Sequence, residues 1–118
     1  MRFATVLVRT LKPGKTYDDF VAAWYPDQGF GVEGMGPVLA TNAANERELL
    51  AFGIFDIPED TSLDDVMARI AEQESARHDR IAEIIESTQL RGIYEVRDEY
   101  DFSTDATVAA TRPPGLSR

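Results

Sequence analysis

The order of hydrophobic periods along residues 2–102 limits the folds open to this chain more than any other feature. Four segments carry the alternating or β-branched apolar pattern of strands: residues 2–11, 37–41, 48–57 and 90–102. Two segments repeat apolar residues at helical spacing: residues 16–25 and 62–87. The predicted order is therefore strand, helix, strand, strand, helix, strand.

Right-handed crossovers turn this order into a four-stranded antiparallel sheet with two helices on one face, a ferredoxin-like α+β fold. The first strand is apolar on both sides, with Ala4, Val6 and Val8 on one and Phe3, Leu7 and Leu11 on the other. Two helices cover only one face, and the other would expose more apolar area than a monomer usually tolerates. We therefore expect a homodimer whose sheets pack face to face.

Length and composition bound the domain organisation and the partners. The 118 residues suffice for one domain, which we assign to residues 1–102, with 103–118 as a flexible tail or an arm lying on a neighbour. The net charge of -9 disfavours nucleic acid. No apolar run approaches the ~20 residues of a membrane span, and there is no cysteine. We expect a cytoplasmic protein that binds neither membrane nor nucleic acid.

The segment LVRTLKPGKTYDDFVAAW, residues 7–24, resembles the dimeric α/β-barrel superfamily, which includes antibiotic-biosynthesis-type monooxygenases, haem-degrading enzymes and NIPSNAP-like proteins. The strand, the Lys12–Lys15 turn and a helix marked by Phe20 and Trp24 carry this resemblance. It implies a dimer with a pocket between helices and sheet, and no single chemistry. Gln28 stands at the spacing where several relatives carry a histidine.

Glu74 interrupts the apolar stripe of the long helix, with Arg77 and His78 on the two shoulders of the same face. Glu74 and His78 are i, i+4 neighbours, close enough for a hydrogen bond, and His78 is the single histidine of the chain. As an acid-base pair they would serve a cofactor-independent monooxygenase or isomerase acting on an aromatic or polyketide-like molecule. The alternative is that they overhang the sheet with their charged ends in water. The function expected first is binding of a small organic ligand, with no assigned activity.

Further candidate ligand contacts are Trp24, Tyr25, Arg9, Tyr94 and Phe30. The aromatic residues would form pocket walls, although core packing explains buried aromatics equally well. Arg9 shares a strand face with Phe3 and Leu7, so it either anchors an anion or pairs with a carboxylate on the last strand. We expect no metal site and no cofactor, because one histidine without cysteines is a poor ligand set. Haem ligation by His78 stays an open alternative.

The glycine-rich stretch GFGVEGMG, residues 29–36, matches the spacing GxGxxG of a dinucleotide-binding loop. Such a loop follows a strand and opens a helix, so that the helix N-terminus meets the phosphate. Here the predicted helix precedes the glycines and a strand follows them. The stretch is therefore interpreted as a flexible lip of the pocket, with Phe30 and Met35 able to close over a ligand.

Overall fold

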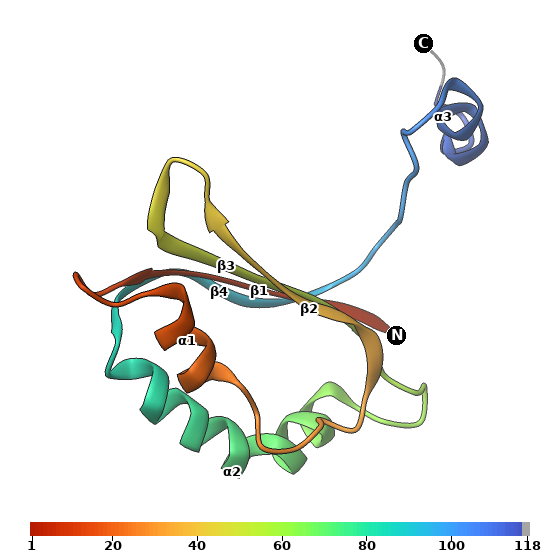
Figure 1. Ribbon diagram of the computed structural model, residues 1–118. Helices are drawn as coiled ribbons and strands as arrows, with labels where there is room; N and C mark the ends of the chain where they lie inside the picture. The colour runs from red at the N-terminus through yellow and green to blue at the C-terminus, as the bar shows by residue number, and fades with distance from the viewer. Residues whose placement is uncertain (117–118) are drawn as a thin grey trace.

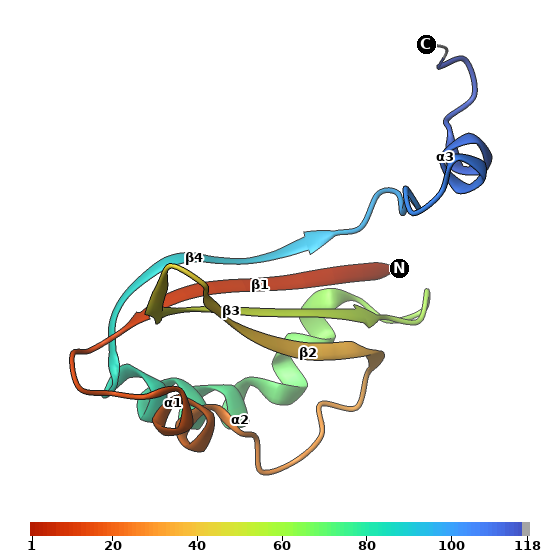
Figure 2. The same ribbon diagram turned by 45° about the horizontal axis from the view of Figure 1, so that its top comes forward.

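The computed structural model describes residues 1–116 and shows a four-stranded antiparallel sheet with two helices packed on one face (Figure 1). The elements are β1 (Arg2–Leu11), α1 (Tyr17–Trp24), β2 (Glu33–Asn42), β3 (Asn45–Asp56), α2 (Leu63–Ala82), β4 (Ile85–Glu95) and α3 (Asp105–Thr111). The strand order is β2-β3-β1-β4. The ferredoxin-like α+β prediction is confirmed, including the position of both main helices on the same face (Figure 2).

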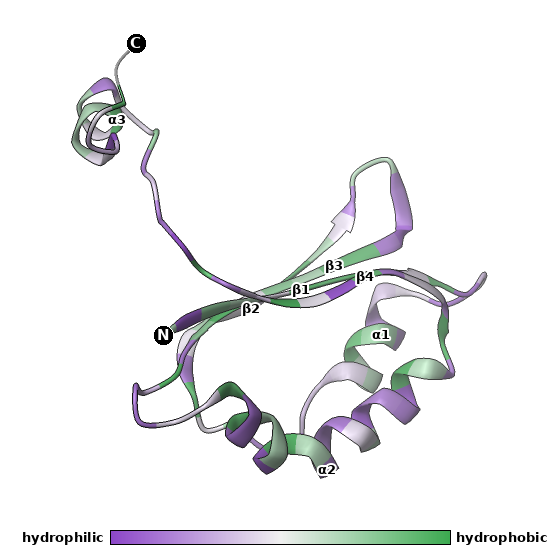
Figure 3. Ribbon diagram, turned by 180° about the vertical axis from the view of Figure 1, so that it is seen from behind, coloured by the Kyte–Doolittle hydropathy of each residue, from purple (hydrophilic) through white to green (hydrophobic). Residues whose placement is uncertain are grey.

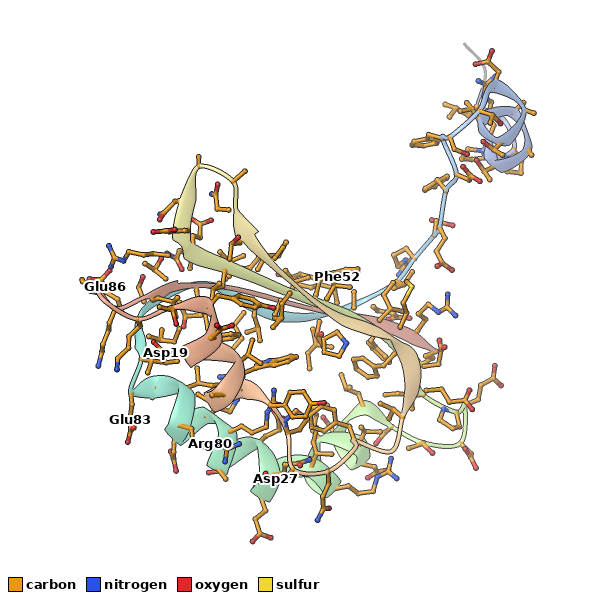
Figure 4. The ribbon with its side chains drawn as sticks, viewed as in Figure 1. Asp19, Asp27, Phe52, Arg80, Glu83 and Glu86 are labelled. Atoms are coloured by element: carbon orange, nitrogen blue, oxygen red, sulfur yellow. The ribbon has the colours of Figure 1, made fainter. Side chains whose placement is uncertain are left out.

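The strand register confirms that the sheet has two apolar faces. Val6 pairs with Phe52, and both lie on the side away from α1 and α2, where Figure 4 shows the labelled Phe52. The opposite side carries the buried residues Phe3, Arg9 and Leu11 of β1. The uncovered face therefore consists of apolar side chains from all four strands: Ala4, Val6, Val8, Met35, Val38, Leu50, Phe52, Ile54, Leu90 and Tyr94.

The core between sheet and helices divides into two clusters. One contains Leu11, Phe20, Leu49 and Ile81, and the other contains Phe3, Ile57 and Val66. The residues of β1, β3 and α2 that lie between these clusters in sequence include Arg9, Ala51, Gly53 and Arg77. The interface is thus apolar at both ends and contains two buried arginines, Arg9 and Arg77, between them. Figure 3 shows the mixed colouring of α2 that follows from this arrangement.

Side-chain caps fix where both main helices begin. The Thr16 hydroxyl accepts a hydrogen bond from the Asp19 N–H, and the Asp19 carboxylate accepts one from the Thr16 N–H. The same kind of cap at α2 has the Ser62 hydroxyl accepting from the Asp65 N–H at 3.1 Å. Each cap satisfies a backbone N–H that the helix leaves without a partner. These starts match those predicted from the sequence.

The boundary between α2 and β4 differs from the prediction. The helix ends at Ala82 instead of residue 87, and β4 covers residues 85–95 instead of 90–102. Ile84 and Ile85 continue the helical spacing of apolar residues, but both follow the last residue of α2. They pack against the core cluster that contains Leu11 and Ile81. Ile85 does so as the strand partner of Leu11. Strand pairing therefore overrides the local helical pattern.

The segment after β4 leaves the domain and ends in a short helix, α3 (Figures 1 and 2). The sequence predicted no regular element here, because the apolar residues show no period. A reciprocal cap between Thr104 and Thr107 starts the helix, and none of its residues is buried. Tyr100 and Phe102 stack on each other before it, with ring centroids 5.8 Å apart. Among residues 1–116, no helix is long and apolar enough to cross a membrane.

Candidate functional site

Arg9 of β1 lies at the centre of the polar part of the interface between helices and sheet. Its residue surface is 5 % exposed, and its Nε and Nη1 atoms are buried with no hydrogen-bond partner within residues 1–116. The sequence offered a carboxylate on the last strand as one possible partner. The charges that act on Arg9 are those of Arg91, Arg77 and Glu74, so β4 contributes a second arginine here and no acid. Burial lowers the pKa of Arg9, and the neighbouring arginines lower it further.

Arg77 of α2 is also buried, but the chain satisfies its guanidinium. Nε donates to the backbone carbonyl of Trp24 at 2.7 Å, and Nη1 pairs with the Glu74 carboxylate. The guanidinium also lies over two aromatic rings, 5.6 Å from the centroid of Trp24 and 5.3 Å from that of Phe30. Cation–π contacts of this kind add to the ion pair. Arg77 therefore joins α1, α2 and the segment that follows α1.

Arg77 and Arg80 together cap the C-terminal end of α1. Arg80 donates from Nε to the carbonyl of Ala23 at 3.1 Å, beside the bond from Arg77 to Trp24. The last carbonyls of a helix have no partner within it, and cationic side chains complement the negative end of its dipole. The last turn of α1 contains no basic residue of its own. Arg77 and Arg80 of α2 therefore supply the cationic donors that the last turn of α1 lacks.

His78 meets Arg91 of β4 more closely than it meets Glu74. Nη2 of Arg91 lies 2.7 Å from Nε2 of His78, whereas Glu74 Oε2 lies 3.7 Å from the same nitrogen. Guanidinium only donates, so Nε2 accepts and the proton of the neutral ring is on Nδ1. The direct Glu74–His78 hydrogen bond expected from the i, i+4 spacing is not formed, because Arg77 takes the carboxylate.

Burial is the main cause that lowers the pKa of His78, followed by the charges of Arg91 and Arg9. Glu74 acts in the opposite direction, and Arg77 adds a further lowering effect. These groups come from β1, β4 and α2, the elements that surround the ring. The imidazole is consequently held neutral at pH 7.

The segment between α1 and β2 lies against α2. The backbone N–H of Gln28 donates to Gln73 Oε1 at 2.9 Å, and Phe30 packs on Arg77 as described. Gly31 has φ +73°, which favours glycine, and a Cβ at Gly34 would lie 2.0 Å from the carbonyl oxygen of Ile54. The glycines thus serve a left-handed turn and a close strand approach. Gly29 and Gly31 lie between α1 and β2, whereas Gly34 and Gly36 belong to β2, so the interpretation of residues 29–36 as a flexible lip was wrong for residues 33–36. No helix begins after the glycines, in agreement with the prediction that they form no dinucleotide-binding loop.

Two residues predicted near a ligand lie on the other face of the sheet. Tyr94 pairs with Ala4 and is 50 % exposed on the side away from the helices. Met35 pairs with Ile54 on that same side and is 63 % exposed. The prediction that either one borders a pocket between helices and sheet was therefore wrong. The alternation of side chains along each strand was predicted correctly. Which of the two faces lies against the helices followed only from the strand register.

Of the remaining predicted residues, Trp24 belongs to the site and Tyr25 lies at its edge. The Trp24 ring stacks on Phe20 and approaches Arg77. Tyr25 is 66 % exposed and touches Trp24 edge to face, with centroids 6.4 Å apart. Arg91 and Gln73 were missed by sequence reasoning. The alternation of β4 places Arg91 on the face opposite Tyr94, which is the signal that could have identified it.

Metal ligation has no arrangement to support it in the described part of the chain. Histidine, aspartate and glutamate side chains of residues 1–116 form no group of three or more suited to an ion. Two surface grooves lie elsewhere, one beside the turn at residues 14–17 and one between Gly31–Glu33 and Asp56–Pro58. Neither groove is lined by Arg9, Arg77 or His78. The polar cluster extends from the interior to the surface: Arg9 and Arg77 are buried, Glu74 and His78 are partly exposed, and Arg91 is exposed on the edge strand.

The fold and this polar cluster define a class of small α+β proteins with a ferredoxin-like βαββαβ core. No protein-family model matches the chain, and no curated protein sequence is significantly similar to it. The similarity found is to solved structures. It supports the resemblance to antibiotic-biosynthesis-monooxygenase-type proteins at the level of fold.

One similar structure is a candidate antibiotic biosynthesis monooxygenase from Chloroflexus aurantiacus J-10-fl, with a TM-score of 0.57 and 13% sequence identity. The match covers 84% of this chain and 97% of that protein. Another is a candidate antibiotic biosynthesis monooxygenase from Bordetella bronchiseptica, with a TM-score of 0.53 and 13% identity over 81% of this chain and 97% of that one. At this identity the likeness establishes a shared fold alone.

Proposed function

We propose that this protein binds a small organic ligand between α2 and the helix-facing side of the sheet. The observation that carries the proposal is the division of the core into two apolar clusters with a buried arginine between them. A helix–sheet interface that served stability alone would be apolar throughout, because an unpaired buried charge costs several kcal/mol. Ligand sites are mostly apolar hollows with a few converging polar groups, which is the composition found here.

The residues around Arg9 favour a flat or aromatic ligand. Arg9 pairs with Leu49 of the first core cluster, and the small residues Ala51 and Gly53 follow along β3 toward the second cluster, which contains large residues. Trp24 and Phe30 contribute aromatic rings on the helix side. The segment around Phe30, tied to α2 by the Gln28–Gln73 hydrogen bond, would cover the ligand as a lip.

A substitution that fills this space tests the proposal. We expect Ala51→Leu to retain the fold, with a change of a few °C in Tm, because the added methylenes enter the ligand space. In a filled core the same change would cost about 1–3 kcal/mol through overpacking. Ala71→Leu, at an exposed position of α2, is the matched control. A large loss of stability confined to Ala51→Leu would show that no ligand space exists at this position.

A second candidate function is a cofactor-independent monooxygenase or isomerase that uses His78 and Glu74 as its acid-base pair. The lowered pKa of His78 favours it, since a neutral imidazole at pH 7 can accept a proton. Nε2 would have to exchange its hydrogen bond from Arg91 for one from the substrate. A ligand that engages Arg91 would permit this exchange. Glu74 would then stabilise the imidazolium from 3.7 Å away.

Oxygen uptake with a dihydroxyanthrone as probe tests the enzymatic candidate. His78→Gln should abolish oxygen uptake and leave Tm nearly unchanged. Glu74→Gln should reduce the rate of oxygen uptake, because the carboxylate that stabilises the imidazolium is lost. Equal rates for the wild-type protein and His78→Gln would remove His78 from catalysis. Uptake that is absent throughout, together with ligand binding, would leave the binding function as the conclusion.

The uncovered sheet face supports the proposal of a homodimer. Val38, Leu50 and Leu90 are at least 40 % exposed on it, a pattern that a monomer would present to water. A second copy offers a matching apolar face, and a face-to-face pair would satisfy both copies. The extension after β4 leaves the domain on this open side, so α3 and the Tyr100–Phe102 pair would lie on the partner as an arm. Deleting residues 103–118 should weaken the dimer without unfolding the domain of residues 1–102.

A further inference from the structure

We infer that the ligand of this site is an organic carboxylate bound by the guanidinium of Arg9. The inference rests on the ligand-binding function proposed above and adds the chemical class of the ligand. It starts from a difference between two arginines in the same interface. Arg9 is 5 % exposed and Arg77 is 7 % exposed, yet residues 1–116 supply hydrogen-bond acceptors to Arg77 and none to Nε or Nη1 of Arg9.

The unpaired atoms of Arg9 identify where an acceptor belongs. Nε and Nη1 are buried, and residues 1–116 supply no acceptor for either. Arginine stays protonated in proteins, so this charge cannot be removed by loss of a proton. Burying a charge without partners is strongly unfavourable, and an anionic acceptor would offset this cost by pairing with the guanidinium. The side chain also packs on the helix-facing side of the sheet, toward Arg91 and Glu74.

The charge balance of the cluster points to an anion. The guanidinium groups of Arg9, Arg77 and Arg91 lie near one another, and among residues 1–116 the acidic group that acts on them and on His78 is Glu74. Arg91 is the exposed member of the three. Glu74 is already committed to Arg77. This local excess of positive charge occurs in a chain with a net charge of -9. It is therefore a local arrangement of the interface and not a reflection of overall composition.

The surroundings of the donors favour an organic carboxylate over inorganic phosphate. The planar guanidinium can bind two oxygens of either anion, so the preference rests on the apolar neighbours. Trp24 and Phe30 add flat apolar surfaces beside the cluster, suited to the organic part of an aromatic or conjugated acid. Arg91 would provide the second contact by leaving Nε2 of His78, from which it now lies 2.7 Å away.

The first experiment measures Tm without any ligand, at fixed protein concentration and low salt. Arg9→Met replaces a buried unpaired charge by an apolar chain of similar length, so we expect Tm to rise by about 4 °C or more. Arg97→Met, at an exposed position, is the matched control and should leave Tm unchanged. A fall in Tm for Arg9→Met would assign Arg9 a structural role and overturn the inference.

The second experiment compares sodium benzoate with benzamide, its uncharged counterpart, and with inorganic phosphate. Benzoate at ten times its Kd should raise Tm by about 5 °C in the wild-type protein and in Arg97→Met, but not in Arg9→Met. Benzamide and phosphate should give at most a small shift. Ionic strength is held constant with sodium chloride, so that general screening is the same in every sample.

The outcomes separate this inference from the proposed function. Binding of benzamide as tight as that of benzoate would overturn the carboxylate assignment and leave organic ligand binding in place. Benzoate binding that persists in Arg9→Met, or an Arg9-dependent response to phosphate alone, would likewise overturn it. Absence of binding by both aromatic compounds would overturn the inference together with the proposed function.

Discussion

Nη2 of Arg91 lies 2.7 Å from Nε2 of His78, and this contact joins the edge strand β4 to the C-terminal part of α2. Because the guanidinium donates, the imidazole accepts, and the pair is compatible only with an unprotonated Nε2. Protonation of His78 would place two cations in contact. The contact, together with burial, makes the histidine a reporter of the charge in the helix–sheet interface.

We predict that His78 titrates below its ordinary pKa of about 6.5 and that Arg91→Gln raises this pKa. Burial is the largest cause of the lowering and would persist in the variant, so the recovery should be partial. His78 is the single histidine of the chain, so its ring Cε1–H signal can be followed by NMR from pH 4 to 8 without assignment. Arg97→Gln is the control, and identical titrations for all three proteins would contradict the prediction.

Stability should fall as pH decreases below about 6.5, the ordinary pKa of histidine. In that range the unfolded chain binds a proton at His78 while the folded protein, whose His78 pKa is lowered, does not. The contribution of neutral His78 to the free energy of unfolding is therefore complete above the pKa that the histidine has in the unfolded chain. It is lost as pH falls toward the lower pKa of the folded protein. Urea unfolding between pH 5 and 7 measures it, and His78→Gln should flatten the slope. If His78→Gln leaves the pH dependence of the free energy of unfolding unchanged, that dependence comes from other groups.

Arg77→Met should destabilise the protein by about 2 kcal/mol, opposite in sign to Arg9→Met. The change leaves the Trp24 carbonyl and the Glu74 carboxylate without their partner and removes the cation–π contact with Phe30. Urea unfolding at fixed protein concentration measures the loss. Arg69→Met, at an exposed position of the same helix, should stay within about 0.5 kcal/mol of wild type. Equal effects at residues 69 and 77 would contradict the role assigned to Arg77.

Benzoate should raise the pKa of His78. A bound carboxylate neutralises Arg9 and draws Arg91 away from Nε2, which removes two of the causes that lower this pKa. The same NMR titration, repeated at saturating benzoate, measures the change, and benzamide serves as the control. If benzamide raises the pKa of His78 as much as benzoate does, the change is caused by packing and not by charge.

Phe52→Lys should convert the proposed dimer into monomers. Phe52 pairs with Val6 near the centre of the uncovered sheet face, so a lysine there would bury a charge in the face-to-face interface. Sedimentation velocity at micromolar concentration resolves the two species. Ala44→Lys, in the β2–β3 turn, adds the same charge away from that face and should leave the dimer intact. A monomeric wild-type protein would contradict the dimer itself.

The sequence by itself determined the order of the elements from β1 to β4, the starts of α1 and α2, and the two apolar faces of the sheet. These features depend on local physics: the alternation of Ala4, Val6 and Val8, the caps at Thr16 and Ser62, and the handedness of crossovers. The end of α2 was wrong because Ile84 and Ile85 fit both a helical and a strand pattern, and pairing with β1 decided between them.

Only the tertiary structure decided which polar residues meet. Spacing along α2 paired Glu74 with His78, but Arg77 competes for the carboxylate, and Arg91 approaches the ring from another element. Strand register likewise moved Tyr94 and Met35 to the open face. Periodicity assigns a side chain to a face, whereas contacts between elements distant in sequence depend on register and packing. That is why the buried Nε and Nη1 atoms of Arg9, which find no hydrogen-bond partner in residues 1–116, could be recognised only once the fold was known.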